Sequence, residues 1–142
     1  MAHEPMLSPE AAALLSERID MGSLAKKLGI ELIELSSERA VARMPVAGNT
    51  QPVGLLHGGA HVVLAESLGS MAANVHAHPH ALAVGIELNA SHHKSVREGW
   101  VTGVAVAIKL GSRLVTHEVK MFDEDNNLLS TVRITNLILP KS

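Results

Sequence analysis

The pattern of apolar and polar positions divides the chain into a helical first half and a β-rich second half. After residue 80, β-branched and apolar residues alternate with polar ones in long segments, which is typical of strands. The turns between these segments are marked by Gly99, by Gly111-Ser112 and by the polar run 123–127. We therefore expect antiparallel strands over 82–93, 100–110, 114–122 and 128–139.

The first part of the chain predicts shorter elements. Ser8 followed by Pro9 is typical of a helix N-cap and the first helical residue. Gly29 ends a second short helical pattern, and two alternating segments flank the polar turn 36–39. The expected elements are a helix over 9–19, a helical turn over 23–28 and a hairpin of 30–35 with 40–44.

The stretch QPVGLLHGGAHVVLAESLGSMAANV, residues 51–75, predicts a loop that leads into one long central helix over 59–75. Its large apolar residues recur at helical spacing on one stripe, which should pack on the strands: Leu64, Leu68, Met71, Ala72 and Val75. One long helix on a curved antiparallel sheet is an α+β arrangement. No repeat or linker divides the chain, so we expect a single domain over 1–142 with an N-terminal helical segment over 1–28.

From Gly58 to Val75 the central helix carries one formally charged side chain, Glu66. Glu66 lies roughly 200° around the helix from Leu64, and its expected neighbours on that far face are uncharged: Val62, Val63, Gly69, Ser70 and Ala73. A sheet covers one side of a helix, so we expect a second subunit to cover this face and partly desolvate Glu66. Burying an unpaired carboxylate is costly, which favours a chemical role. The alternative is an ordinary solvated surface glutamate.

The start of the helix, His57-Gly58-Gly59, supplies a complementary feature. The first backbone N–H groups of a helix lack intrahelical acceptors, and the helix dipole adds partial positive charge there. Two glycines let a substrate approach the backbone, so a carbonyl oxygen that gains negative charge is stabilised at this place. Glu66 follows about 10 Å along the helix, a length that a bound acyl group could span. Gln51 and His57 can add hydrogen bonds, and Ser70 adds a hydroxyl one turn after Glu66.

Composition excludes several classes of protein. The formal net charge of the 142-residue chain is −2 and its basic residues are scattered, so nothing favours binding to a nucleic acid. The absence of cysteine excludes disulfides, thiolate metal sites and a cysteine nucleophile. The N-terminal sequence lacks a secretory signal pattern, and no segment approaches about 18 consecutive apolar residues. We therefore expect a cytoplasmic protein with no membrane-spanning helix.

Together, these motifs resemble the hotdog-fold acyl-CoA thioesterases; they are Gln51-Pro52, Gly54, Leu56-His57-Gly58-Gly59, Leu64-Ala65-Glu66 and Ser70. The segments VGIELNASHHK and MFDEDNNLLSTVRI are similar to the branch of 4-hydroxybenzoyl-CoA, phenylacetate-pathway and 1,4-dihydroxy-2-naphthoyl-CoA thioesterases. The resemblance covers about residues 22–140. It implies a helix wrapped by an antiparallel sheet, homodimers that often pair into homotetramers, and active sites at the dimer interface. It also implies an aromatic or medium-chain acyl-CoA substrate, with no cofactor and no metal.

The same resemblance implies a role for each motif. Glu66 acts as the nucleophile or as the general base for water, and the Gly58 N–H polarises the thioester carbonyl. Gln51 and His57 position the thioester group, and Ser70 helps to place the water or the carboxylate. The rest of the substrate, including the coenzyme A nucleotide, meets residues from both subunits: Gly59, the basic segment His92-His93-Lys94 and the turn Gly111-Ser112-Arg113. One departure is Ser95, which stands where relatives often have proline.

Two alternative functions remain open, a hotdog hydratase and a non-catalytic acyl-CoA-binding module. A hydratase usually pairs a histidine with an acidic residue at a different spacing, and a pure binder has no use for a lone carboxylate. His76, His78 and His80 alternate near Pro79, but no Asp or Cys accompanies them, so we expect no metal site there. HGGAH lacks the glutamate of a zinc-binding HExxH helix, and the patterns for a serine triad, a dinucleotide and a P-loop are missing.

Overall fold

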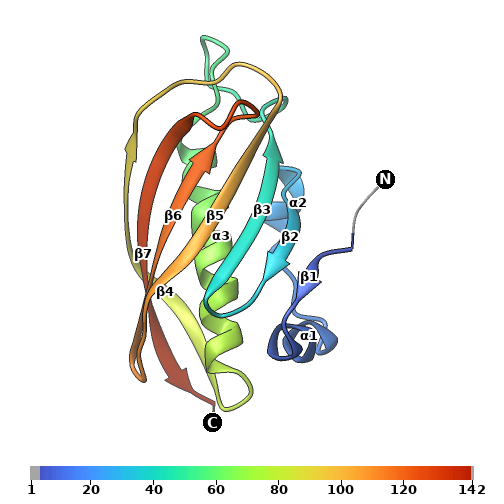
Figure 1. The fold of residues 1–142 in the computed structure, drawn as a ribbon, viewed down its shortest axis with the longest axis vertical. Coiled ribbons are helices and arrows are strands. Elements are labelled where there is room, and N and C mark those ends of the chain that lie inside the picture. Colours follow the sequence, from blue (N-terminus) through green and yellow to red (C-terminus); the bar gives the residue numbers. More distant parts are fainter. Residues whose placement is uncertain (1–3, 142) are drawn as a thin grey trace.

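The protein is described by a computed structural model that covers residues 4–141 (Figure 1). A short strand and two short helices come first, and one long helix separates a hairpin from four long strands. The elements are β1 Met6–Leu7, α1 Pro9–Ser16, α2 Gly22–Lys27, β2 Glu31–Leu35, β3 Arg39–Pro45, α3 Gly58–Ala77, β4 Ala81–His92, β5 Trp100–Leu110, β6 Leu114–Phe122 and β7 Leu128–Pro140.

All the strands join one 7-stranded sheet in the order β1-β2-β3-β5-β6-β7-β4. Every pair is antiparallel except β1 with β2, which is parallel. The sheet curves around α3, with β4 (yellow) along one edge and the short β1 (blue) at the other (Figure 1). The predicted α+β hotdog arrangement, a long helix wrapped by an antiparallel sheet, is confirmed. β1 was not expected, because a two-residue parallel pairing leaves no periodic pattern.

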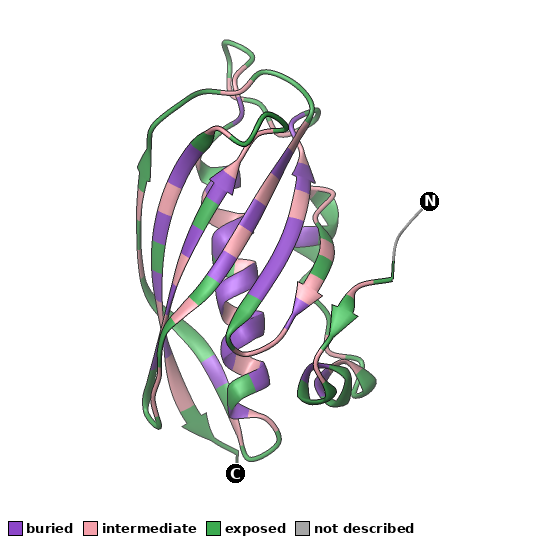
Figure 2. Cartoon of the chain, viewed as in Figure 1, coloured by how far each residue is buried: buried purple, intermediate pink, exposed green. Residues whose placement is uncertain are grey.

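The core lies between α3 and the concave face of the sheet, where most of the helix is buried (Figure 2). The predicted stripe is confirmed, since Leu64, Leu68 and Ala72 are fully buried and Met71 and Val75 nearly so. Gly103 of β5 lets the helix approach closely, because a side chain there would lie 3.0 Å from Leu68. Burial of this apolar stripe fixes which face of α3 is turned away from the sheet.

The prediction for the far face of α3 was partly wrong. Gly69 and Ala73 are buried against the sheet, and a Cβ at Gly69 would overlap the Ile134 side chain of β7. A flat sheet covers one side of a helix. This sheet is curved, so its strands β7 and β4 also cover part of the far side of α3. The face left open is therefore narrower than expected, and its residues are Val62, Val63, Glu66, Ser67, Ser70 and Asn74.

Element boundaries differ from the predictions by a few residues at helix ends. α1 ends at Ser16 rather than near residue 19, because Arg18 has φ of 63°, which leaves the helical region. α3 begins at Gly58 and continues to Ala77, one and two residues beyond the predicted ends. Within residues 4–141, no helix has the length and apolarity that crossing a bilayer would require.

The edge strand β4 is tied to α3 by one side chain. Asn74 accepts a hydrogen bond from the Ala83 N–H at 2.9 Å and donates to the Ala83 carbonyl at 3.0 Å. It also donates to the Ser70 carbonyl at 2.8 Å, within its own helix. Both main-chain polar groups of Ala83 are thus occupied by a side chain, although most of β4 is exposed.

Candidate active site

The N-terminus of α3 is capped by its own loop. His57 is the N-cap residue, and its Nδ1 accepts a hydrogen bond from the Gly59 N–H at 2.8 Å. Because Nδ1 is an acceptor, the neutral His57 ring carries its proton on Nε2 and can donate it outward. The N–H of Gly58, the first helical residue, has no intrahelical acceptor. Gly58 therefore offers a free donor at the positive end of the helix dipole, while the Gly59 N–H is already used.

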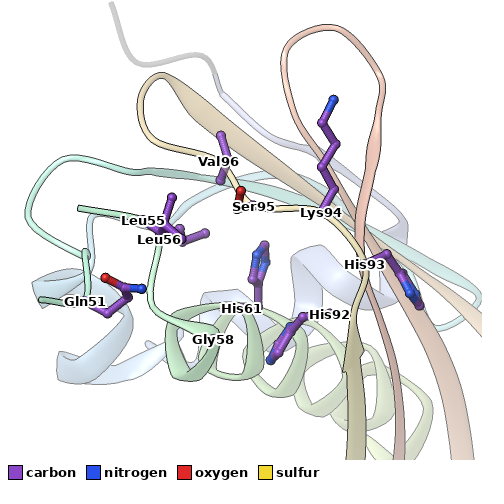
Figure 3. A pocket seen from close by; sticks show the side chains of 10 residues that line it. All are labelled: Gln51, Leu55, Leu56, Gly58, His61, His92, His93, Lys94, Ser95 and Val96. Carbon is purple, nitrogen blue, oxygen red and sulfur yellow. The ribbon is translucent and has the colours of Figure 1, made fainter. Parts of the chain in front are cut away.

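A cavity of about 300 Å³ opens beside Gly58 (Figure 3). The Oε1 atom of Gln51 accepts a hydrogen bond from the Val53 N–H at 2.6 Å, so the amide nitrogen of Gln51 is left to donate. That nitrogen points toward the cavity in Figure 3. The residues that line the cavity, here named the glycine cavity, are Gln51, Leu55, Leu56, Gly58, His61, His92, His93, Lys94, Ser95 and Val96.

His92 is held by a short chain of hydrogen bonds on the sheet side of this cavity. Its Nδ1 lies 2.9 Å from the Ser130 hydroxyl, which donates its hydrogen to the Ser91 carbonyl at 3.1 Å. With its one hydrogen on the Ser91 carbonyl, the hydroxyl accepts from Nδ1 of His92, and in this tautomer the neutral ring has its lone pair on Nε2. This Nε2 lies against the helix start, since a Cβ on Gly58 would lie 2.7 Å from it. A side chain at position 58 would therefore require the His92 ring or the helix start to move.

His61 is a lining residue that the sequence analysis considered only as a possible metal ligand. Its side chain is 4% exposed, and its ring lies in a stacked arrangement with His92 at 5.4 Å between centroids. Burial, with the neighbouring His92 as the second cause, lowers the pKa of His61 to about 4. Its Nδ1 is buried without a hydrogen-bond partner. His61 is therefore a neutral ring at pH 7, at the floor of the glycine cavity.

The other basic residues of the predicted coenzyme A segment lie at the rim. The Nε2 of His93 is 2.8 Å from the Thr131 hydroxyl, and Lys94 is exposed beside it. His92 and His93 bond to neighbouring residues of β7, but only His92 faces Gly58. The structure thus brings Gln51, Gly58 and the segment 92–94 together at one cavity.

Glu66 lies at a second cavity, of about 480 Å³, on the open face of α3. This cavity, here named the glutamate cavity, is lined by Ile19, Asp20, Met21, Glu66, Ser67, Ser70, Met71, Asn74 and Leu82. The Oε2 atom of Glu66 lies over the backbone of β4, since a Cβ added to Gly85 would lie 3.0 Å from it. Glu66 was expected to be partly desolvated, and in the single chain it is exposed. Within residues 4–141 the sheet ends at β4 and leaves Glu66 exposed, and its cover by a second subunit stays a prediction.

Ser70 lies beside Glu66 and contacts a residue that the sequence analysis missed. The Ser70 hydroxyl is 3.2 Å from Oδ1 of Asn136, a fully buried residue of β7. Nδ2 of Asn136 is buried without a hydrogen-bond partner. Turning the amide over would place Nδ2 against Ser70 and free the hydroxyl hydrogen for the cavity. Asn136 thus controls what Ser70 can donate; its place in an alternating strand gave no signal of this.

The two cavities are separate within one chain. They have no lining residue in common, and Glu66 follows Gly58 by about 12 Å of helical rise. The turn 111–113 is farther still, because the Gly111 carbonyl lies 2.9 Å from Nε2 of His76, near the last turn of α3. Gly58 and His76 are about 27 Å apart along the helix. One chain does not bring the turn 111–113 and the segment 92–94 together.

In the histidine-rich segment after α3, His78 has a carboxylate partner. Nε2 of His78 lies 3.0 Å from the Glu17 carboxylate of the α1 end, and this hydrogen bond is the main cause that lowers the pKa of Glu17. In the part of the chain that the structure describes, no group of three His, Cys, Asp or Glu side chains is placed to hold one metal ion.

Comparison with known proteins places the chain in a family. Residues 53–130 match the model of the Thioesterase superfamily. The 1,4-dihydroxy-2-naphthoyl-CoA hydrolase of Escherichia coli K12 is 43% identical over 119 residues, which cover 83% of this chain and 88% of that protein. The proofreading thioesterase EntH of Cronobacter turicensis is 40% identical over 120 residues, covering 84% of this chain and 88% of that protein.

Solved structures agree with this result. Thioesterase HI1161 from Haemophilus influenzae superposes with a TM-score of 0.80 at 34% identity, covering 90% of this chain and 87% of that chain. A mutant of thioesterase PA1618 from Pseudomonas aeruginosa gives 0.81 at 36% identity, covering 93% of both chains. The chain belongs to the thioesterase superfamily, and it is a thioester hydrolase of the hotdog fold.

Proposed function

We propose that the protein hydrolyses an acyl-coenzyme A to a carboxylic acid and free coenzyme A. The observation that carries the proposal is the free N–H of Gly58, at the positive end of α3, opening on a cavity with a basic rim. A thioester carbonyl can bind there, with the phosphates of coenzyme A near His93 and Lys94. The named substrate of the Escherichia coli relative is likewise a coenzyme A thioester.

In the proposed reaction the Gly58 N–H donates a hydrogen bond to the carbonyl oxygen and stabilises the negative charge that grows on it. The amide nitrogen of Gln51 and the Nε2–H of His57 position the thioester group. Glu66 acts in one of two ways. As a nucleophile it adds to the carbonyl carbon, the C–S bond breaks, coenzyme A leaves as the thiolate, and water then cleaves the mixed anhydride. As a general base it takes a proton from the water that attacks the same carbon; the C–S bond of the tetrahedral intermediate then breaks, and coenzyme A leaves with that proton as the thiol.

The Gly58 and the Glu66 that act on one thioester belong to two subunits of a homodimer. A donor must lie about 3 Å from the carbonyl oxygen and the attacking atom about 3 to 3.5 Å from the carbon. The glycine and glutamate cavities of one chain share no wall, which argues against one chain meeting both conditions. The open face of α3 and the exposed edge strand β4, with Val84 and Ile86, offer the surface for a second copy. Two dimers can pair into a tetramer, but the site needs only the dimer.

Mixing two defective variants tests this arrangement. Gln51→Ala damages the glycine cavity and Glu66→Ala damages the glutamate cavity. A heterodimer of the two has one intact site, so a randomly reassorted mixture should regain about a quarter of wild-type thiol release. Differently tagged chains allow the heterodimer to be purified and its formation verified. A verified heterodimer no more active than its parents would place both halves of the site in one chain.

The same assay decides between the proposal and its alternatives. The wild-type protein should release thiol from at least one member of a panel of aromatic and aliphatic acyl-coenzyme A thioesters. A hydratase would instead add water to an enoyl-coenzyme A without thiol release. A binding module would bind acyl-coenzyme A and convert none of the panel. Either result would overturn the proposed hydrolysis.

A further inference from the structure

We infer that the acyl group of the substrate is an unbranched aliphatic chain, which runs from Glu66 into an apolar cavity beneath the N-terminal helices. The inference rests on the proposed function, because it places the thioester at the Gly58 and Glu66 groups. It narrows the substrate to one class and names the part of this chain that selects it.

The apolar cavity has a volume of about 300 Å³ and lies between α1, α2, β2 and α3. Its walls are apolar apart from Asp20 and Lys26, which are both exposed and therefore belong to its mouth. The lining residues that form the interior are Leu15, Met21, Ala25, Ile30, Leu32 and Met71. Apart from Ala25, these side chains belong to, or pack against, the main hydrophobic core.

This cavity adjoins the glutamate cavity. The two have Asp20, Met21 and Met71 as common walls. Met71 of α3 is 6% exposed, and Met21 is half-buried in the loop between α1 and α2. Methionine side chains are flexible and adapt to the shape of an apolar neighbour. An acyl chain that starts at the carbonyl beside Glu66 can therefore pass between the two methionines into the interior.

The chemistry of the interior favours methylene groups over rings that carry hydroxyls. It contains no side-chain donor or acceptor that could pair with a buried hydroxyl, so a hydroxylated ring would lose its hydrogen bonds to water without replacement. An aromatic acyl group would also find no ring of this chain to stack on, since no Phe, Trp, Tyr or His lines the cavity. The substrate class inferred here differs from the dihydroxynaphthoyl group in the relative's name.

A substrate series tests the inference on the purified wild-type protein. We compare thiol release from butyryl-, octanoyl- and dodecanoyl-coenzyme A with that from 4-hydroxybenzoyl- and 1,4-dihydroxy-2-naphthoyl-coenzyme A. We expect kcat/KM to rise about threefold to fourfold per added methylene until the cavity is full. Preference for the hydroxylated rings, with no dependence on chain length, would overturn the inference and leave the hydrolase intact. No thiol release from any member would defeat the proposed function itself.

Filling the cavity tests its location. Ala25 is 3% exposed at the cavity wall, so in Ala25→Phe the ratio of kcat/KM for dodecanoyl-coenzyme A to that for butyryl-coenzyme A should fall to about one. Leu15 of α1 is half-buried and lines the same cavity. Leu15→Phe also narrows the interior, and it is used instead if Ala25→Phe fails to fold. Leu24→Phe is the matched control, because Leu24 lies beside Ala25 in α2 but is 54% exposed. An unchanged chain-length profile in a folded Ala25→Phe or Leu15→Phe protein would overturn the inference.

Discussion

The two ends of the proposed chemistry are built in different ways on the same helix. The glycine cavity is complete within one chain, because the His57 cap, the Ser130-bound His92 and the stacked His61 all fix its geometry. The glutamate cavity is open, with its carboxylate exposed over the edge strand β4. The comparison teaches that the group proposed to bind the carbonyl oxygen is positioned by folding of one chain, whereas the proposed catalytic carboxylate is left exposed by it.

The largest effect is expected at the glutamate cavity. Glu66→Gln keeps the shape of the side chain but removes the charge needed for nucleophilic attack or for accepting a proton. We expect kcat for the preferred acyl-coenzyme A to fall roughly 10³-fold, in the range for a positioned acid–base group. Thiol release under saturating substrate measures this. Ser67→Ala, one residue along on the same face, should change kcat little, and a small loss in Glu66→Gln would remove the carboxylate from the mechanism.

The second-largest effect is expected at the glycine cavity. Gly58→Ala places a methyl group 2.7 Å from the present position of His92 Nε2, so the ring or the helix start must move. We expect kcat to fall on the order of 10²-fold, since small displacements of a reacting group have effects of this size. Adding His92→Ala removes the clash, so kcat of the double variant should be roughly tenfold higher than that of Gly58→Ala. A double variant no more active than Gly58→Ala would show that the clash is not the cause.

A smaller effect is expected where Glu66 meets the edge strand. Gly85→Ala puts a Cβ 3.0 Å from Oε2 of Glu66, and the carboxylate must shift by a few tenths of an ångström. We expect kcat to fall roughly tenfold with KM nearly unchanged, because the carboxylate rather than the substrate pocket is displaced. Asn89→Ala is an exposed change in the same strand and serves as the control. Equal kinetics in both variants would mean that β4 does not position Glu66.

The last prediction concerns stability rather than rate. The pKa of His61 is about 4 in the folded protein, below its value of 6.5 when unfolded, so the unfolded chain binds more protons between these values. Stability must therefore fall as the pH is lowered from about 6.5 toward 4, and His61 accounts for about 2 kcal/mol between pH 7 and pH 5. His61→Gln should lose that much less on acidification, as measured by urea unfolding at both pH values. His93→Gln, an exposed change at the same cavity, should retain the full loss.

Much of the fold could be predicted from the sequence because the signals are local. The predicted strands over 100–110 and 114–122 agree with β5 and β6 residue for residue, since alternation between turns defines both ends. The buried stripe of α3 follows from helical spacing alone. The extent of wrapping could not be predicted, and Gly69 and Ala73 were therefore assigned to the wrong face. Sheet curvature depends on all the strands together and leaves no mark on the helix.

The candidate site also has one part that the sequence could predict and one part that it could not. Gln51 and Gly58 lie close together in the sequence, so their meeting at one cavity could be expected, and His57 caps the same helix start. His61 of α3 contacts His92 of β4, and Asn136 of β7 contacts Ser70 of α3, each far away in the chain. Their unpartnered buried nitrogens are properties of tertiary packing, which single-sequence patterns do not contain. The roles assigned to Glu66, Ser70 and the segment 92–94 remain predictions that the variants above decide.

The amide of Asn74 has a consequence for how molecules of this protein can stack. A bare sheet edge recruits further strands through its unused N–H and C=O groups, and long flat edges are starting points for fibres. At Ala83 both groups are already hydrogen-bonded to Asn74. Strand addition along β4 is therefore interrupted near the C-terminal end of α3. Only the stretch beyond residue 83 remains available, which permits one short, finite pairing and opposes unlimited growth.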